Sequence, residues 1–361
     1  MDSPTQMLLG AAIGQTCFGH KLGRRAAWWG AVGGTIPDLD VVIIPFLGRI
    51  GEFLYHRGPT HSLVFGAVVG PLLGYAVWLG YRRKQRRNEA EEVCSVATLG
   101  HRSLLPAWIG LFVLTLMTHP LLDIFTTYGT VLFWPFSDAR IALNGVAITD
   151  PAYSLILIFA LFIGSRYRAR PVIAMRVGAF ALALSTAYLF YALSIHHRTE
   201  AFVANQLLDE GIAAENVKAY PTILQPYLRR VVVRTPGTVR VGFVSMWKPQ
   251  RIEWSEFSED KHPFVQRLRD TEDGQVFEWF AMGQTVSTVR RNGDEIVIEL
   301  DDIRYGFPDS PRHGIWGIRG RFNEDGTLNG PVEYFNRPRP ASIPDLLRTL
   351  LKQTFAPKPE E

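Results

Sequence analysis

The feature that most constrains the fold is the uneven distribution of apolar residues along this 361-residue chain. Nearly all of the long apolar runs lie before residue 196, and a helix needs about 20 such residues to cross the hydrocarbon core of a bilayer. Four runs reach or approach that length, at residues 62–81, 104–122, 153–165 and 177–195. Two more, 7–19 and 26–47, could be spans, re-entrant segments or buried helices. Residues 1–195 are therefore expected to form a helical membrane domain with about four to six spans.

Residues 196–361 have the composition of a soluble domain. Short segments of alternating polarity, separated by turn residues, predict strands; they cover residues 230–234, 238–244, 276–281, 285–290, 295–300 and 314–319. Helices are expected at 202–208, 213–218 and 342–352. The predicted fold class is thus an α-helical polytopic membrane domain, residues 1–195, followed by a small soluble β-rich (α+β) domain, residues 196–361.

Basic residues beside the apolar runs predict the orientation of the chain. Loops rich in Lys and Arg remain in the cytoplasm under the positive-inside rule. The three basic groups are Lys21, Arg24 and Arg25; Arg82, Arg83, Lys84, Arg86 and Arg87; and Arg166, Arg168, Arg170 and Arg176. With these groups in the cytoplasm, the C-terminal domain is expected on the extracytoplasmic side of the membrane. The net charge is only +4, and the basic residues lie beside apolar segments, which favours membrane lipid over nucleic acid as a partner.

Three clusters of metal-ligand side chains lie within the apolar segments or at their edges. Ionisable groups at membrane depth are costly and are seldom kept without a function. We expect these residues to bind one or two divalent ions, and the ligand set is Asp38, Asp40, His56, His61, His119 and Asp123. A mixed nitrogen and oxygen set suits zinc or manganese, and also iron.

Each cluster also has a purely structural interpretation. His119 and Asp123 are four residues apart, so on a helix they share a face and could simply form a hydrogen bond inside a bundle. Asp38 could cap a following helix. The segment around His56 and Arg57 could place its polar groups at the membrane interface. The later histidines (His196, His197, His262 and His313) show no ligand spacing with nearby acids and are expected to be surface residues.

Other residues near these clusters could serve catalysis or substrate binding. Asp40 or Asp123 could act as general base, and Arg57 could stabilise a phosphoryl or carboxyl oxyanion. A helix that begins near residue 62 would present free backbone N–H groups to an anion. The expected substrate-binding residues are Thr60, Ser62 and Arg140. The sequence contains no serine-hydrolase elbow, P-loop or dinucleotide fingerprint.

The order of these motifs resembles the YdjM-like family of predicted membrane-bound metal-dependent hydrolases. The matching elements run Pro37-Asp38-Leu39-Asp40, His56-Arg57-Gly58-Pro59-Thr60-His61-Ser62, His119-Pro120-Leu121-Leu122-Asp123 and Trp134-Pro135-Phe136-Ser137. The resemblance covers roughly residues 1–170 and implies a bacterial inner-membrane protein. The family usually begins with a Thr-His pair, whereas this chain has Thr5-Gln6. Glutamine offers an amide oxygen and is a poor zinc ligand.

These observations together predict a membrane-bound metal-dependent hydrolase. A bound metal would lower the pKa of water from about 15.7 toward 7 and so supply a nucleophile at neutral pH. A site at the edge of the bilayer favours an amphiphilic substrate, such as a phospholipid or lipid phosphate, at the outer face. The alternatives to a hydrolase are a cation transporter and a non-catalytic scaffold in which the metal only holds the helices together. Clustering at one face argues against a transport pathway, and an open coordination position would favour the hydrolase over the scaffold.

Overall fold

The computed structural model describes residues 1–91, 104–167, 170–293, 295–307, 310–337 and 342–355. Arg168, assigned above to a basic loop, lies outside these residues. The chain divides into two compact units. The first unit comprises Met1–Phe46, Tyr55–Leu143 and Ile148–Phe190, and the second comprises Leu47–Leu54, Asn144–Ala147 and Tyr191–Glu361.

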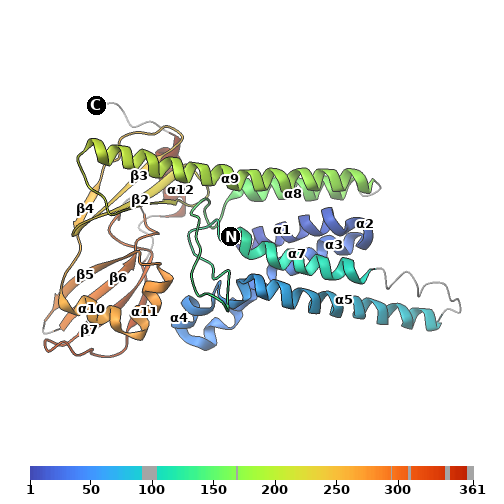
Figure 1. The fold of residues 1–361 in the computed structure, drawn as a ribbon, viewed down its shortest axis with the longest axis horizontal. Coiled ribbons are helices and arrows are strands. Elements are labelled where there is room, and N and C mark those ends of the chain that lie inside the picture. The colour runs from blue at the N-terminus through green and yellow to red at the C-terminus, as the bar shows by residue number, and fades with distance from the viewer. Residues whose placement is uncertain (92–103, 168–169, 294, 308–309, 338–341, 356–361) are drawn as a thin grey trace. The chain divides into compact units, whose positions relative to one another are not determined.

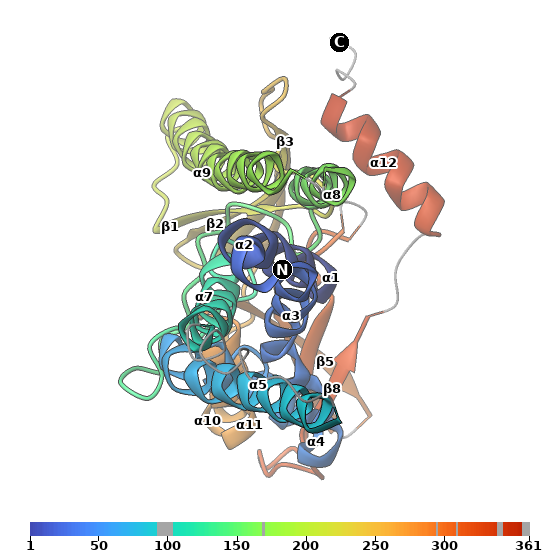
Figure 2. The same ribbon diagram turned by 90° about the vertical axis from the view of Figure 1, so that its right-hand side faces the viewer.

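Helices build the first unit (Figures 1 and 2). In chain order they are α1 (Ser3–Ile13), the π-helix η1 (Gly14–Phe18), α2 (Gly19–Leu22), α3 (Arg24–Thr35), the 3-10 helix η2 (Pro37–Val42), α4 (Ile44–Tyr55), the 3-10 helix η3 (Pro59–His61), α5 (Leu63–Glu91), α7 (Leu105–Asp123), α8 (Pro151–Arg166) and α9 (Pro171–Asp209). Most of α4 and the end of α9 belong to the second unit.

Three of the four predicted spans are confirmed as helices long and apolar enough to cross a membrane. They are Leu63–Gln85 within α5, Leu105–Asp123 and Pro171–Asp209. The predicted span at 153–165 lies in α8, which is apolar but only 16 residues long. Within the two ambiguous runs the helices are shorter still, and α3 breaks into η2 at Pro37.

Glycines let two pairs of helices approach closely. A Cβ atom on Gly10 of α1 would collide with the carbonyl oxygen of Gly30 in α3, and a Cβ atom on Gly30 would collide with that of Gly10. In α5, Gly66, Gly70 and Gly74 lie against the backbone of α7 in the same way. Small residues at four-residue spacing drive such packing in membranes, where apolar burial between helices contributes little. These contacts fix the helix ends that carry the site described below.

The second unit contains two four-stranded antiparallel sheets, as the predicted α+β class requires. The first sheet has the order β1 (Asn216–Pro221), β2 (Leu228–Thr235), β3 (Thr238–Ser245) and β4 (Ser255–Ser258). The second has the order β5 (Thr285–Asn292), β6 (Glu295–Asp302), β7 (Trp316–Phe322) and β8 (Glu333–Asn336). Helices α10 (Pro263–Asp270), α11 (Glu272–Phe280) and α12 (Ile343–Phe355) complete it.

Two local predictions in this unit were wrong. Residues 276–281, predicted as a strand, lie mostly in α11, because the Thr271 side chain caps that helix by accepting a hydrogen bond from Gly274 N–H. The acidic first turn, Glu272 and Asp273, also favours a helix N-terminus. Residues 213–218, predicted as a helix, lead into β1, whose backbone pairs with β2 over its whole length. Tertiary pairing thus overrides local propensity there.

Candidate metal centre

Three segments of the first unit bring the predicted ligands together. Asp38 and Asp40 lie on η2, directly after α3, and His61 is the last residue of η3, just before α5 begins. His119 and Asp123 lie on the last turn of α7 and share one face, with Pro120 accommodated inside the helix. All five side chains are buried. The site is therefore enclosed by protein and lies where α5 begins and α7 ends.

Three ligand atoms form a compact triangle. The Nε2 atoms of His61 and His119 are 3.0 Å apart, and each lies 3.3 Å from Oδ1 of Asp38. Nitrogen and oxygen ligands lie about 2.0–2.2 Å from zinc, so two corners of a zinc tetrahedron are roughly 3.3–3.6 Å apart. Two edges of the triangle have this length and the third, between the two Nε2 atoms, is about 0.3 Å shorter, so these residues could hold a metal ion.

The hydrogen bonds on the outer side of the imidazoles fix which nitrogens face inward. Nδ1 of His119 lies 2.7 Å from the carbonyl oxygen of Gly34. A carbonyl only accepts, so Nδ1 carries the proton and Nε2 presents a lone pair to the triangle. Among the described residues, the buried oxygens Asp38 Oδ2 and Asp123 Oδ2 have no hydrogen-bond partner. Nitrogen and oxygen atoms of this kind are ligands of zinc, so the residues present fit a divalent metal.

The protonation states of Asp38 and His61 have opposite effects on metal binding. Burial alone would raise the pKa of Asp38, but the neighbouring His119 and His61 imidazoles hold it well below its usual value, so this group remains a carboxylate. Burial would lower the pKa of His61, whereas Asp38, Asp40 and Asp123 raise it above its ordinary value. A metal must therefore displace a proton from this imidazole, so binding should release protons.

Asp123 lies on the other side of the two imidazoles. Its Oδ2 atom is 3.4 Å from Nε2 of His61 and 3.5 Å from Nε2 of His119. Its Oδ1 atom accepts a hydrogen bond of 2.9 Å from Nε2 of Gln6, contacts the Met1 amino group and lies 3.6 Å from the guanidinium of Arg57. One oxygen is thus held by donors, while the other faces the imidazole nitrogens.

Asp40 and His56 lie behind His61, outside the triangle. Oδ2 of Asp40 is 3.4 Å from Nδ1 of His61 and accepts hydrogen bonds from Thr60 Oγ1 and from the backbone N–H of Arg57. Nδ1 of His56 lies 3.0 Å from Oδ1 of Asp40. Burial would raise the pKa of Asp40, but the hydrogen bonds from His56 and His61 hold it well below the usual range. Asp40 therefore orients the His61 ring and remains charged.

We predict that Asp40→Asn lowers zinc affinity about 10- to 100-fold, because it weakens the group that orients His61 without removing a triangle atom. Zinc titration of the purified protein against a competing chelator measures this change. Glu52→Gln, at an exposed acid on α4, is the matched control and should leave affinity unchanged. An unaltered affinity in Asp40→Asn would mean that this carboxylate does not support the site.

The remaining predicted site residues form hydrogen bonds with other groups of the protein. The Arg57 guanidinium donates to Thr126 Oγ1 and to the Met1 carbonyl, and Arg140 donates to the Gly129 carbonyl. Thr60 contacts Asp40, as described above. Ser62 caps α5, since its Oγ accepts from Phe65 N–H while donating to the Pro59 carbonyl. The sequence prediction of substrate binding by Thr60, Ser62 and Arg140 remains a prediction.

Two contributors were not predicted as site residues. The Tyr128 ring packs between the guanidinium groups of Arg57 and Arg140, at 4.9 and 5.4 Å from their central carbons. Gln6 is buried and donates to the His119 carbonyl and to Asp123, so it contacts the site as an amide rather than as an imidazole. Gln6 could have been predicted, because it stands where the family usually has the histidine of a Thr-His pair. Nothing in the sequence around Tyr128 indicates a role for this loop residue.

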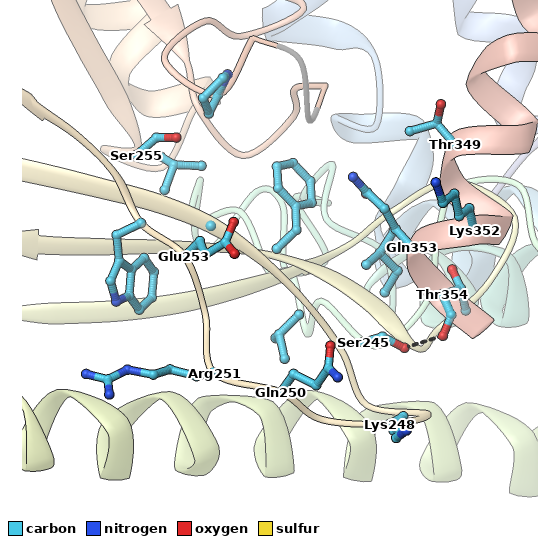
Figure 3. A pocket seen from close by; sticks show the side chains of 17 residues that line it. Ser245, Lys248, Gln250, Arg251, Glu253, Ser255, Thr349, Lys352, Gln353 and Thr354 are labelled. Carbon is cyan, nitrogen blue, oxygen red and sulfur yellow. Dashed lines mark hydrogen bonds between the residues drawn. The ribbon is translucent and has the colours of Figure 1, made fainter. Parts of the chain in front are cut away.

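A separate hollow of about 680 Å³ lies in the second unit (Figure 3). Strand β3 and helix α12 supply part of its lining, where Ser245 Oγ donates to the Thr354 carbonyl at 2.7 Å. Lys248, Arg251 and Lys352 give it a basic character that Glu253 offsets only in part. Among the described residues that line this hollow there is no histidine and none of the predicted site residues, so its chemistry is unrelated to the metal-ligand cluster.

The fold and the site together define a helical membrane protein with a buried His/Asp group that could bind a metal. A family model described as "YdjM inner membrane protein" matches residues 1–199, more than half of the chain and all of the cluster. The chain belongs to this family, so the resemblance and the membrane location are confirmed.

The chain is also similar to "Inner membrane protein YbcI" of Escherichia coli (strain K12). The two are 37% identical over 131 residues, which is 34% of this chain and 64% of the relative. The match thus spans just under two thirds of the length of the relative. No solved structure shows significant similarity to the chain.

Proposed function

We propose that this protein is a membrane-bound metal-dependent hydrolase that acts on an amphiphilic substrate. The observation that carries the proposal is the triangle of Asp38, His61 and His119 with Asp123 Oδ2 beside it. Three protein ligands are typical of catalytic zinc sites, whereas structural sites usually have four.

In this proposal each residue has one role. Asp38, His61 and His119 hold the ion, which would supply Lewis acidity and an activated water at neutral pH. Asp123 accepts the proton of the attacking water through Oδ2 as general base. The Gln6 amide and the Arg57 guanidinium hold Oδ1 of the same carboxylate, which keeps Oδ2 directed at the imidazoles.

The position of the cluster along the helices supports an amphiphilic substrate at the outer face. His61 precedes the first residue of α5 and Asp123 is the last residue of α7, so the ligands lie at the same end of this packed helix pair. Arg82, Arg83 and Lys84 lie toward the other end of α5. Under the positive-inside rule that end is cytoplasmic and the ligand end is external. A lipid phosphate is the substrate class that we propose to test first.

Asp123→Asn is expected to lower hydrolysis of lipid phosphates about 10²- to 10⁴-fold while zinc remains bound, because it removes a general base but none of the three triangle atoms. The assay is phosphate release from phosphatidic acid and from lipid pyrophosphates by zinc- or manganese-loaded protein in nanodiscs. Glu52→Gln is the control. Absence of turnover on every lipid phosphate by fully loaded wild-type protein would contradict the proposed substrate class.

The burial of the ligand atoms favours one competing function, a structural metal site that joins the helices without catalysis. In that case Asp123 would be a fourth ligand, and a closed site would join η2, η3 and α7. The Asp123→Asn variant distinguishes the structural site from the hydrolase, since a structural site predicts loss of zinc and of thermal stability together. The hydrolase predicts that zinc is kept.

A further inference from the structure

A second group of metal-ligand side chains lies on the last part of α9, in the second unit. His196 is buried there, at 6% exposure, contrary to the expectation of a surface residue. Glu200 follows it by four residues, so both side chains share one face of the helix. His197 lies between them in sequence and is exposed.

Hydrogen bonding fixes the orientation of His196. Its Nδ1 atom lies 3.0 Å from the carbonyl oxygen of Ala219 in β1. Because a carbonyl only accepts, Nδ1 carries the proton, and a neutral ring then presents the Nε2 lone pair on its other side. A histidine that ligates a metal usually donates its second N–H to a carbonyl or carboxylate in this way.

The inward nitrogen faces an acceptor rather than a donor. Nε2 of His196 is 3.4 Å from Oε1 of Glu200. This oxygen is buried and has no hydrogen-bond partner among the residues that the structure describes. A lone pair opposite a carboxylate oxygen is unfavourable unless a proton or a metal cation lies between them. A ring nitrogen of His197 completes a group whose three ligand atoms all lie within 4.8 Å of one another.

We propose that His196, His197 and Glu200 form a second divalent-metal site, independent of the proposed hydrolase centre. Two histidines and one glutamate are a known zinc ligand set. Through the His196–Ala219 hydrogen bond, a metal there would tie the polar end of α9 to the first sheet. Its expected role is to stabilise the second unit.

Nearby positive charge limits the affinity of this site. Arg229 and Lys218 interact electrostatically with His196 and oppose a cation. The Arg229 guanidinium donates hydrogen bonds to the carbonyl oxygens of Pro226, Asn144, Gly145 and Ala192, and it also interacts electrostatically with Glu200. We therefore expect weaker zinc binding here than at the Asp38, His61 and His119 centre.

The test uses the full-length protein in detergent with the first centre removed by His61→Ala and His119→Ala. Zinc titration of this double variant should still show one equivalent bound. Adding His197→Ala or Glu200→Gln should weaken that binding at least tenfold, whereas adding His20→Ala, at an exposed histidine on α2, should not change it.

A second readout guards against misfolded variants. Zinc should raise the melting temperature of the double variant, and His197→Ala should abolish that rise without changing the far-UV circular dichroism spectrum. If the folded double variant binds no zinc, a shared proton joins His196 to Glu200 and the proposal is wrong. Binding that is equally strong in His197→Ala and Glu200→Gln would also overturn it.

Discussion

His119→Ala is expected to lower the zinc affinity of the main centre at least about a hundredfold. The change removes one of three triangle atoms and leaves Asp38 Oδ1 and His61 Nε2 without their third partner. Structural zinc sites gain roughly 10–16 kcal/mol from their ligands together. One ligand of such a set is then worth about 3 kcal/mol or more, and each 1.4 kcal/mol is tenfold in affinity.

The measurement is competitive zinc titration in a His197→Ala background, which removes the second proposed site. His20→Ala is the matched histidine control, because this exposed residue lies outside both ligand groups. An affinity within threefold of wild type in the His119→Ala protein would exclude this residue as a ligand.

Gly30→Leu is expected to abolish metal binding although residue 30 contacts no ligand. Its Cβ would collide with the Gly10 carbonyl oxygen, so α1 and α3 must separate. Overpacking a well-packed interior typically costs 1–3 kcal/mol, and here the collision is with backbone that cannot rotate away. Asp38 follows α3 and Gln6 lies on α1, so the separation displaces both from His119 and Asp123.

Gly80→Leu provides the matched control, because a Cβ at Gly80 in α5 meets no atom within 4 Å. Melting temperature and zinc content are measured on both variants in the same detergent. Gly30→Leu should lose metal and melt several degrees lower, whereas Gly80→Leu should match wild type. Full zinc content in Gly30→Leu would show that the α1–α3 contact does not position the site.

Hydropathy alone was sufficient to predict the long helices, because a span needs an apolar run of a certain length whatever it packs against. The helix α11 was not predictable in the same way. Its apolar residues, such as Phe277 and Phe280, follow one another closely and resemble a buried strand until the capping role of Thr271 is seen. The first-sheet strand β1 was missed because pairing with β2, which no local pattern shows, determines its conformation.

For the candidate metal centre, the cost of burying charge pointed to residues that the structure brings together, but it did not predict the position of each one in the group. Asp38 and Asp40 are two residues apart on η2, and with three residues per turn in a 3-10 helix they point in different directions. Only the structure shows Asp38 beside His119 and Asp40 behind His61. The expectation that His196 has no ligand spacing with a nearby acid was wrong, because Glu200 follows it by four residues. The burial of His196 could not be seen in the sequence.

The metal centre of Asp38, His61 and His119 is tested most simply by elemental mass spectrometry of purified Glu200→Gln protein, in which binding at the second proposed site is weakened at least tenfold. We expect one equivalent of a divalent transition metal, retained when His20→Ala is added and lost when Asp38→Ala or His61→Ala is added. Absence of metal in every sample, including protein incubated with zinc or manganese, would contradict a metal centre built from Asp38, His61 and His119.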